Sequence, residues 1–507
     1  MKKSANWFAA LGSGLLLWAS WPVSPFTFFI FVAWVPLLWL ESKIQSRRKF
    51  FGFTYITMLF WNVATTWWVW NASAPGAIGA FLANSLLMCF PWLGYKIARK
   101  WLGDKLSYVS LIVFWLCFEY VHLQDWGLSW PWLTLGNVFA THTESIQWYE
   151  YTGAAGGSLW IMIVNVLLFL HLKNNLNRQG NKSYKNLLAA VLLMIIPVTI
   201  SIFSSVAKPV IGDRNIVIVQ PDIDPYEKIS EGSFEAQLQK LIHLSEGEID
   251  ANTAIVVWPE TALYMANGIE ETRMKENPFL QPLWGFMRRH PNVTLFSGVE
   301  SYREYEAYNG SVLLDTTGPL GFYHKSMLVP GVETLPWFLK FIDKWFEKFG
   351  GTTAGYTRQG ERTVLIDEKH GFKIAPSICY ESIYGEFMSR YVKRGANIIC
   401  IITNDGWWGN TQGHKQHMNY ARLRAIETRT WIARSANTGI SCFIDAHGRV
   451  MNPQPWDKTA AIKMNVPFSD HKTFYVIYGD LISKAATVIS ILLLLTSLVI
   501  WIKKKLK

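Results

Sequence analysis

Three apolar stretches of this 507-residue chain end in side chains that can do covalent chemistry. One ends at Glu260, one at Lys325 and one at Cys379. A cysteine at a strand-to-turn junction can expose its sulfur at the edge of a sheet. A nearby carboxylate can take the thiol proton, and a nearby ammonium can stabilise the anion that forms. If the fold brings the three residues together, they form a candidate nucleophilic site.

Each of these residues also has an ordinary interpretation when it is taken alone. Cys379 can be a small buried hydrophobe, as we expect more strongly for Cys400 and Cys442 inside apolar runs. Glu260 can lie beside a helix N-terminus, and Lys325 can be a solvated surface charge. The five cysteines form no CxxC pair and have no accompanying His cluster, so neither a disulfide framework nor a zinc site is predicted. The functional interpretation therefore depends on the combination.

The elements that must position these residues lie in a polar segment, 206–479. Short β-rich runs alternate there with helical patterns such as Phe234–Ile249 and His417–Arg434, which is typical of an α/β domain. A segment of about 270 residues can bury a core of its own. The predicted strands are 215–219, 254–258, 293–297, 311–314, 373–377, 397–402 and 440–444.

The rest of the chain is strongly apolar and contains many of its 26 tryptophans. A helix needs about 20 apolar residues to cross a bilayer, and the shorter runs are at the lower edge of that range. We predict an eight-helix transmembrane bundle, with seven spans in 1–205 and the eighth, followed by a basic tail, in 480–507. The first run is expected to be retained, because a second follows it too closely for a cleaved signal peptide. The apolar runs are 7–21, 25–40, 50–70, 77–95, 106–122, 157–172, 186–204 and 480–502.

The net charge of +11 comes from the loops between these runs. Eighteen Lys and Arg residues lie in alternate loops and at the two ends of the chain, against two acids, Glu41 and Asp104. The intervening loops 71–76 and 123–156 contain neither Lys nor Arg. The positive-inside rule places both termini in the cytosol and 206–479 outside it. The remaining charges sum to a small negative value, so no nucleic-acid partner is expected, and no Walker-type loop predicts ATP chemistry.

Several short motifs then point to a known family. In order along the chain, they are WPETA (258–262), YHKSMLVPGVE (323–333), ICYES (378–382), TNDGWWG (403–409), QHMNYARLRAIE (416–427) and ANTGIS (436–441). Within these motifs, Glu260, Lys325 and Cys379 resemble the Glu-Lys-Cys triad of the nitrilase, or carbon-nitrogen hydrolase, superfamily. With the membrane helices added, nearly the whole chain resembles the bacterial apolipoprotein N-acyltransferases. That resemblance implies an αββα sandwich for 206–479.

The resemblance also implies roles for individual residues. Glu260 would be the general base, Lys325 the cation that stabilises the oxyanion, and Cys379 the nucleophile. Supporting active-site positions would be Glu333, Tyr380 and Glu381. From its place beside the nucleophile, the Tyr380 backbone N–H can also donate to the oxyanion. The loop before Glu333 reads VPGV where the family often has VPFG, which keeps the glutamate but alters its surroundings.

The implied reaction moves an acyl chain from a phospholipid to Cys379 as a thioester. The chain then passes to the α-amino group of the N-terminal S-diacylglyceryl-cysteine of an apolipoprotein, the last step of lipoprotein maturation. We expect a monomeric inner-membrane enzyme without a metal or an organic cofactor. Two alternatives stay open: a membrane-anchored nitrilase-type amidase and a non-catalytic lipid-binding or transport subunit.

Both implied substrates are embedded in a bilayer, and one segment suits that setting. Aromatic residues recur every four positions in 337–349, at Trp337, Phe341, Trp345 and Phe349, with lysines on another face. This pattern predicts an amphipathic interfacial helix that contacts lipid. The following Gly350-Gly351-Thr352-Thr353 would let it hinge as a lid. The alternative is an ordinary core-packing helix.

Overall fold

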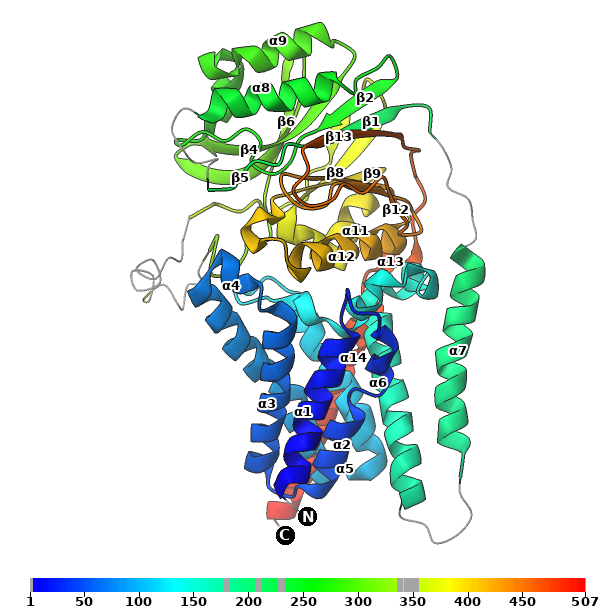
Figure 1. Ribbon diagram of the computed structural model, residues 1–507. Helices are drawn as coiled ribbons and strands as arrows, with labels where there is room; N and C mark the ends of the chain where they lie inside the picture. Colours follow the sequence, from blue (N-terminus) through cyan, green and yellow to red (C-terminus); the bar gives the residue numbers. More distant parts are fainter. Residues whose placement is uncertain are drawn as a thin grey trace. The chain divides into compact units, whose positions relative to one another are not determined.

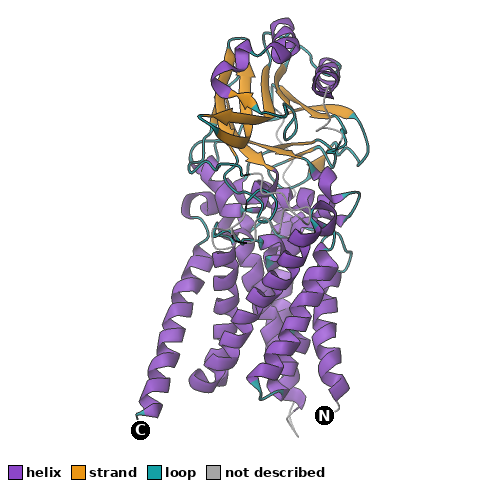
Figure 2. Ribbon diagram, turned by 90° about the vertical axis from the view of Figure 1, so that its left-hand side faces the viewer, coloured by secondary structure: helices purple, strands orange, loops and turns teal. Residues whose placement is uncertain are grey.

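The computed structural model describes residues 3–176, 183–205, 212–226, 233–334, 341 and 355–506. The chain forms two compact units (Figures 1 and 2). The helical unit comprises Met1–Trp67, Pro75–Val206 and Asp480–Lys507. The sheet unit comprises Ala207–Gly479 together with a short piece, Trp68–Ala74, that lies between two helices of the other unit in the sequence.

The helical unit consists of seven longer helices and a few 3-10 turns within the described residues. Its longest element, α5 (Ala74–His122), is bent at Gly103, whose φ of +76° interrupts the helical backbone. The other helices are α1 (Lys3–Ser20), α2 (Val35–Lys43), α3 (Arg47–Thr66), α6 (Tyr149–Leu176), α7 (Lys185–Ser205) and α14 (Leu481–Lys505). The 3-10 turns are η1 (Thr27–Phe31), η2 (Pro131–Leu133), η3 (Leu135–Thr141) and η4 (Thr143–Ser145).

The prediction of eight spans is only partly matched. In the described part of the chain, four helices are long and apolar enough to cross a membrane, at Ala74–His122, Tyr149–Asn175, Lys185–Ser204 and Leu481–Lys505. The run 25–40 is not one helix, because η1 is followed by turns and α2 starts only at Val35. Pro36 sits in the first turn of α2, where its missing N–H costs no hydrogen bond. The runs 77–95 and 106–122 are the two halves of α5.

The sheet unit contains two twisted sheets. The first has the order β13-β1-β2-β4-β5-β6, with β3 beside β4, and β1, β2 and β4 are parallel. The second has the order β12-β11-β10-β9-β8-β7, and β8, β9 and β10 are parallel. The first sheet's strands are β1 (Asn215–Gln220), β2 (Thr253–Val257), β3 (Ile269–Glu270), β4 (Thr294–Arg303), β5 (Glu306–Asp315), β6 (Gly318–His324) and β13 (Ala460–Asn465). The second sheet's are β7 (Leu365–Asp367), β8 (Phe372–Ile378), β9 (Ile398–Thr403), β10 (Ile432–Ala436), β11 (Cys442–Ile444) and β12 (Val450–Met451).

Helices cover the outer face of each sheet, which gives the αββα layer order that the resemblance implies (Figure 1). The pair α8 (Ser233–Glu246) and α9 (Gln281–Arg289) covers the first sheet, and α11 (Gly385–Lys393) and α12 (Gln412–Thr428) cover the second. The inner faces meet where the Ser435 hydroxyl of β10 donates to the Val219 carbonyl of β1, at 2.7 Å. Every residue of the central strands β1, β2, β9 and β10 is buried, because parallel strands in a sheet that is covered on both faces have no exposed face.

The short helix α4 (Val69–Ala72) belongs to the sheet unit although α3 and α5 flank it in sequence. The Asn71 side-chain amide donates to the carbonyl of Trp408, at 2.9 Å. The rings of Trp68 and Trp408 lie 4.8 Å apart between centroids. A Cβ on Gly413, in the first turn of α12, would lie 2.6 Å from the Trp68 ring, so the close approach requires glycine there.

Candidate active site

The first candidate residue, Glu260, lies just beyond the end of β2. A Cβ on Gly298 in β4 would lie 2.4 Å from the Pro259 carbonyl oxygen and 2.5 Å from the Thr261 nitrogen. The absence of a side chain at Gly298 therefore lets the turn press against the neighbouring strand. Thr261 takes a positive φ of +48°, which redirects the chain immediately after the glutamate. The Glu260 carboxylate is buried and accepts a hydrogen bond from the backbone N–H of Asn404, at 3.0 Å.

Lys325, the first residue after β6, lies between two carboxylates. Its Nζ is 2.8 Å from Glu333 Oε1 and 3.3 Å from Glu260 Oε1. The Asn309 side-chain amide also donates to both acids, at 2.9 Å to Glu260 and 3.1 Å to Glu333. The second Glu333 oxygen accepts from the backbone N–H of Val329, at 2.8 Å. One lysine and one amide thus hold two glutamates in fixed positions.

The charge state of Lys325 follows from these contacts. Burial by itself lowers the pKa of the ammonium, but Glu333 and Glu260 outweigh burial and raise that pKa well above its ordinary value. The lysine side chain is only 1% exposed, so water screens these interactions little. Lys325 is therefore a permanent buried cation at neutral pH.

Cys379 follows β8 directly and begins the 3-10 turn η9 (Cys379–Ile383). Its φ of +52° is uncommon for a residue with a side chain, and such strained positions often occur at functional sites. Burial raises the pKa of the thiol above its ordinary range, the charge of Glu260 raises it further, and that of Lys325 lowers it in part. The sulfur is therefore a neutral thiol at neutral pH and needs a base to become a nucleophile.

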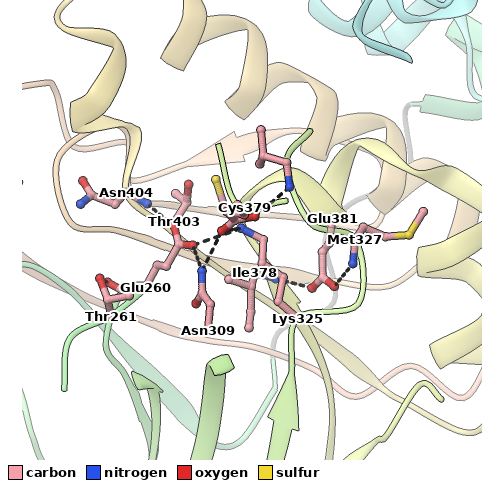
Figure 3. Close-up of polar contacts among 12 residues, drawn as sticks. Glu260, Thr261, Asn309, Lys325, Met327, Ile378, Cys379, Glu381, Thr403 and Asn404 are labelled. Carbon is pink, nitrogen blue, oxygen red and sulfur yellow. Dashed lines mark hydrogen bonds and ion pairs between the residues drawn. The ribbon is translucent and has the colours of Figure 1, made fainter. Parts of the chain in front are cut away.

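Figure 3 shows how these residues converge: Glu260, Asn309, Lys325 and Cys379 come from different strands and point toward one region. The ends of β2 and β6 belong to the first sheet, and the end of β8 belongs to the second. The carboxyl ends of β2, β6 and β8 therefore meet in one region, although β6 pairs antiparallel with its neighbour β5. This arrangement can support nucleophilic acyl chemistry, because it combines a thiol, a carboxylate base and a fixed cation.

Glu381 joins the lysine loop to the cysteine turn. Its Oε1 accepts from the backbone N–H groups of Ser326 (2.7 Å) and Met327 (3.2 Å) and from the Tyr323 hydroxyl (2.6 Å). Its Oε2 accepts from the backbone N–H of Ile378, at 2.8 Å. Burial raises the pKa of Glu381 to about 7, although these donors lower it. The side chain acts as a brace between Lys325 and Cys379.

The remaining predicted positions are placed as follows. The Tyr380 side chain is buried, and its ring lies 5.3 Å from that of Tyr384. Cys400 and Cys442 are buried in β9 and β11, as expected for small hydrophobes. Of the proposed lipid-contacting residues, Phe341 is 83% exposed, whereas Trp337, Trp345 and Phe349 lie outside the described residues, as does the proposed hinge 350–353.

Two features escaped the prediction from sequence. Asn309 lies in β5, which also contains Glu306, Ser311 and Asp315, so one more polar residue there carries no special signal. Asp405, His417 and Arg434 form a fully buried charged cluster behind Cys379. The motif TNDGWWG contains Asp405, and a buried acid after a strand was the available signal. His417 lies in the predicted helical segment His417–Arg434, whose sequence favours a packing and salt-bridge face over catalysis.

Comparisons with known proteins match two regions of the chain to known families. Residues 216–473 match the carbon-nitrogen hydrolase family, and residues 13–167 match the apolipoprotein N-acyltransferase N-terminal domain. The chain is 30% identical to an apolipoprotein N-acyltransferase of Chlorobaculum tepidum, over 94% of each chain. It is 26% identical to one of Geobacter metallireducens, covering 95% of this chain and 93% of that one.

Among solved structures, Nit3 of Saccharomyces cerevisiae, a member of branch 10 of the nitrilase superfamily, is 15% identical with a TM-score of 0.38. The match covers 52% of this chain and 93% of Nit3. The two matched regions and the full-length relatives describe one domain organisation, a helical membrane part joined to a nitrilase-type domain. The chain belongs to the carbon-nitrogen hydrolase family and, within it, to the apolipoprotein N-acyltransferases.

Proposed function

We propose that this chain transfers an acyl chain from a phospholipid to the α-amino group of the N-terminal S-diacylglyceryl-cysteine of apolipoproteins, through a thioester on Cys379. The observation that carries the proposal is the convergence of Cys379 with Glu260 and the buried cation Lys325. The names of its relatives support the substrate class. A purely lipid-binding or transport subunit would have no use for this set.

In the first half-reaction the Cys379 sulfur attacks the carbonyl carbon of a phospholipid ester. Glu260 takes the thiol proton as the carbon–sulfur bond forms, since the raised pKa of the thiol prevents ionisation beforehand. The Lys325 ammonium and the Tyr380 backbone N–H stabilise the negative oxygen of the tetrahedral intermediate. When the intermediate collapses, Glu260 returns the proton to the departing alcohol, and a lysophospholipid leaves.

In the second half-reaction the acceptor amine attacks the thioester carbonyl. An α-amino group has a pKa of about 8, so a usable fraction is neutral at neutral pH. Glu260 takes a proton from the attacking nitrogen, the Cys379 sulfur leaves, and the thiol regains its proton from Glu260. The Asn309 amide donates to both Glu260 and Glu333, and Glu333 accepts from Lys325, so these contacts hold Glu260 and Lys325 in fixed positions throughout.

Several features of the setting form part of the proposal. Eight spans would carry the chain across an inner membrane with both termini in the cytosol and the sheet unit on the periplasmic side, as the distribution of basic residues favours. The protein would act as a monomer. The segment that contains Trp337, Phe341, Trp345 and Phe349 would cover the bound acyl chains and exclude water, which competes with the amine for the thioester.

The proposed reaction is tested with purified protein in detergent, one defined phospholipid and a synthetic S-diacylglyceryl-cysteine peptide. We expect one lysophospholipid released for each peptide that gains an acyl chain, as quantified by mass spectrometry. An N-acetylated peptide is the matched control and should remain unmodified, because its nitrogen cannot attack. Acylation of neither peptide, together with hydrolysis of simple amides, would favour a membrane-anchored amidase instead.

A further inference from the structure

Two adjoining cavities in the helical unit have no part in the proposed reaction. The first, of about 420 Å³, is largely apolar and is lined by Ala9, Val35, Pro36, Trp39, Phe169 and Leu172, with Lys43, Arg99 and Lys173 also on its wall. The second, of about 430 Å³, is polar and is lined mainly by charged residues of α2, α3 and α5. Ser42 and Arg99 line both cavities, so the two lie side by side at these residues.

Buried contacts fix the frame of the polar cavity. Glu41 is 1% exposed, and Lys96 Nζ lies 2.8 Å from its Oε1. The same ammonium donates to the carbonyls of Glu41 (3.0 Å) and Ile44 (2.5 Å), which caps the C-terminal end of α2. The Arg99 guanidinium contacts Glu41 on one side and Asp104, at 3.0 Å, on the other. Arg99 is therefore held in place at the junction of the two cavities.

The balance of charge at this junction favours an anion. The apolar cavity is lined by three cations and no acid. Lys43 is exposed and forms no ion pair with any residue that the structure describes. Lys173 is paired with Asp104 at 3.2 Å, but Asp104 is 59% exposed, and exposed pairs of this kind are weak enough for a phosphate to replace. The polar cavity adds Arg47, Lys96 and Lys100 against Glu41 and Asp104.

We propose that the two cavities form a binding site for one anionic glycerophospholipid of the phosphatidylglycerol type, distinct from the site of acyl transfer. An acyl chain would occupy the apolar cavity, which opens beside Leu172, a residue 47% exposed. The phosphate would lie at the junction, between Arg99, Lys43 and the Ser42 hydroxyl. Basic pockets between membrane helices are known to suit anionic headgroups. The site needs an acyl chain for binding, and the charge of the headgroup decides between phospholipids that carry the same chains.

Native mass spectrometry of the purified full-length protein in detergent tests this site, with phosphatidylglycerol and phosphatidylcholine of identical acyl chains as probes. We expect Lys43→Gln/Lys173→Gln to lower the affinity for phosphatidylglycerol at least fivefold and to leave that for phosphatidylcholine within twofold. Lys49→Gln/Lys105→Gln is the matched control. It removes the same charge from exposed lysines that do not line the cavities, and it should leave both affinities within twofold.

Three results would overturn the proposal. They are equal binding of the two lipids by the wild type, unchanged phosphatidylglycerol binding by the cavity variant, and an equal loss in the control variant.

A second measurement does not depend on variants. Phosphatidylglycerol with a diazirine on its acyl chain should label peptides that contain Trp39 or Leu172, and labelling confined to the sheet unit would contradict the site. Inorganic phosphate at millimolar concentration should not compete, since it lacks the acyl chain.

A different observation, the charged cluster behind Cys379, carries a second inference. His417 of α12 is fully buried, and its Nε2 lies 3.1 Å from the Cys379 carbonyl oxygen and 2.9 Å from the Ser382 hydroxyl. Its Nδ1 lies 2.9 Å from Asp405 Oδ1. Arg434 binds the other Asp405 oxygen at 2.8 Å. Burial alone raises the pKa of Asp405, but the charges of Arg434 and His417 outweigh it and hold that pKa well below its usual value.

We propose that His417 is a positioning residue: its Nε2–H holds the backbone of Cys379 in the strained conformation that presents the sulfur to substrate. The φ of +52° at Cys379 needs such support, because an unconstrained turn would relax. Asp405 orients the imidazole through its 2.9 Å contact with Nδ1. The Trp408 ring packs edge-on against His417 at 5.4 Å, and Trp68 packs against Trp408. The short piece Trp68–Ala74 is thus linked to His417 by ring contacts, from Trp68 to Trp408 and from Trp408 to His417.

Two substitutions separate positioning from simple packing. In His417→Gln the side-chain amide can still donate near the Nε2 position, whereas in His417→Asn it reaches only the Nδ1 position beside Asp405. We expect the acylation rate constant of Cys379 at saturating phospholipid to fall about 30-fold or more in His417→Asn. The rate constant of His417→Gln should be at least fivefold higher than that of His417→Asn. The concentration of phospholipid that gives half-maximal rate should change less than threefold.

The matched control is His414→Asn, on the same helix one turn away. The His414 side chain is also buried but packs on Trp456, with 4.4 Å between ring centroids. It should leave the acylation rate constant within threefold of wild type. If both His417 variants lose rate and thermal stability to the same extent, with no recovery in glutamine, His417 is only a packing residue and the second proposal is wrong.

Discussion

The helical unit and the sheet unit each contain a buried glutamate clamped by cations, and the two clusters differ in one respect. Glu41 in α2 contacts Lys96, Arg99 and, at 3.2 Å, the Tyr95 hydroxyl. Glu260 contacts Lys325 at 3.3 Å, but it also lies near a thiol at a strained turn. A buried ion pair is thus not by itself a catalytic signal. The pair becomes one where the fold adds a nucleophile whose proton the carboxylate can take.

The largest effect should come from removing the nucleophile. We expect Cys379→Ala to lower acyl transfer at least about 10⁴-fold, since loss of a nucleophile removes the whole covalent pathway. Cys400→Ala, one strand away and buried in β9, is the matched control and should retain turnover within a few-fold. Equal losses in the two variants, measured as triacylated peptide per minute, would remove the distinction between the catalytic cysteine and a structural one.

The base should come next. Glu260→Gln keeps the shape of the side chain and an oxygen that can accept from Asn404, but it cannot take a proton. We expect single-turnover acylation to slow by about 10² to 10⁴, the usual contribution of a positioned base. Retention of more than a tenth of the wild-type rate would mean that another group takes the Cys379 proton.

The corresponding change in the helical unit should affect stability rather than rate. Glu41→Gln leaves Lys96 and Arg99 without their buried partner, and these side chains are only 10% and 22% exposed. We expect the free energy of unfolding to fall by about 1–3 kcal/mol, the cost of an unmet buried polar group. The midpoint of thermal unfolding in detergent should drop by several degrees, with turnover within threefold at lower temperature. A large loss of rate in the folded variant would contradict the contrast between the two clusters.

The smallest effect to be resolved is the pH dependence of the thiol itself. Because burial raises the pKa of Cys379, the thiolate fraction should increase with pH through the ordinary thiol pKa of about 8.5 without reaching a plateau. Alkylation of Cys379 by iodoacetamide, followed by peptide mass spectrometry, should therefore accelerate continuously from pH 6 to pH 9. A plateau below pH 7 would indicate a thiolate already ionised in the resting enzyme, with no need for a base.

Prediction from sequence worked for features that are local along the chain. The strand ends before Glu260 and Cys379 can be recognised because a buried parallel strand is a continuous apolar run with a polar residue after it. Lys325 instead follows β6, which pairs antiparallel with β5 and is only partly buried. Asn309 could not be recognised, since its contact with Glu260 depends on the order β2-β4-β5 in the first sheet. That order is set by packing between segments far apart in sequence.

The helical unit shows the same limit. The run 25–40 has the composition of a membrane helix, yet α2 is only nine residues long and η1 precedes it as a separate turn. Hydropathy measures how apolar a segment is and does not detect where its backbone hydrogen bonds break. The cluster around Glu41 likewise joins α2 to α5 across more than 50 residues, which charge patterning alone could not reveal.

Intact-protein mass spectrometry tests most directly whether Cys379 carries the acyl chain as a thioester. Purified enzyme incubated with one defined phospholipid and no acceptor should gain the mass of one acyl chain and release one lysophospholipid. Neutral hydroxylamine should remove the added mass, Cys379→Ala should never acquire it, and an S-diacylglyceryl-cysteine peptide should take it over. An acyl adduct of equal amount on Cys379→Ala, or a folded wild-type protein that shows neither adduct nor lysophospholipid, would contradict the account.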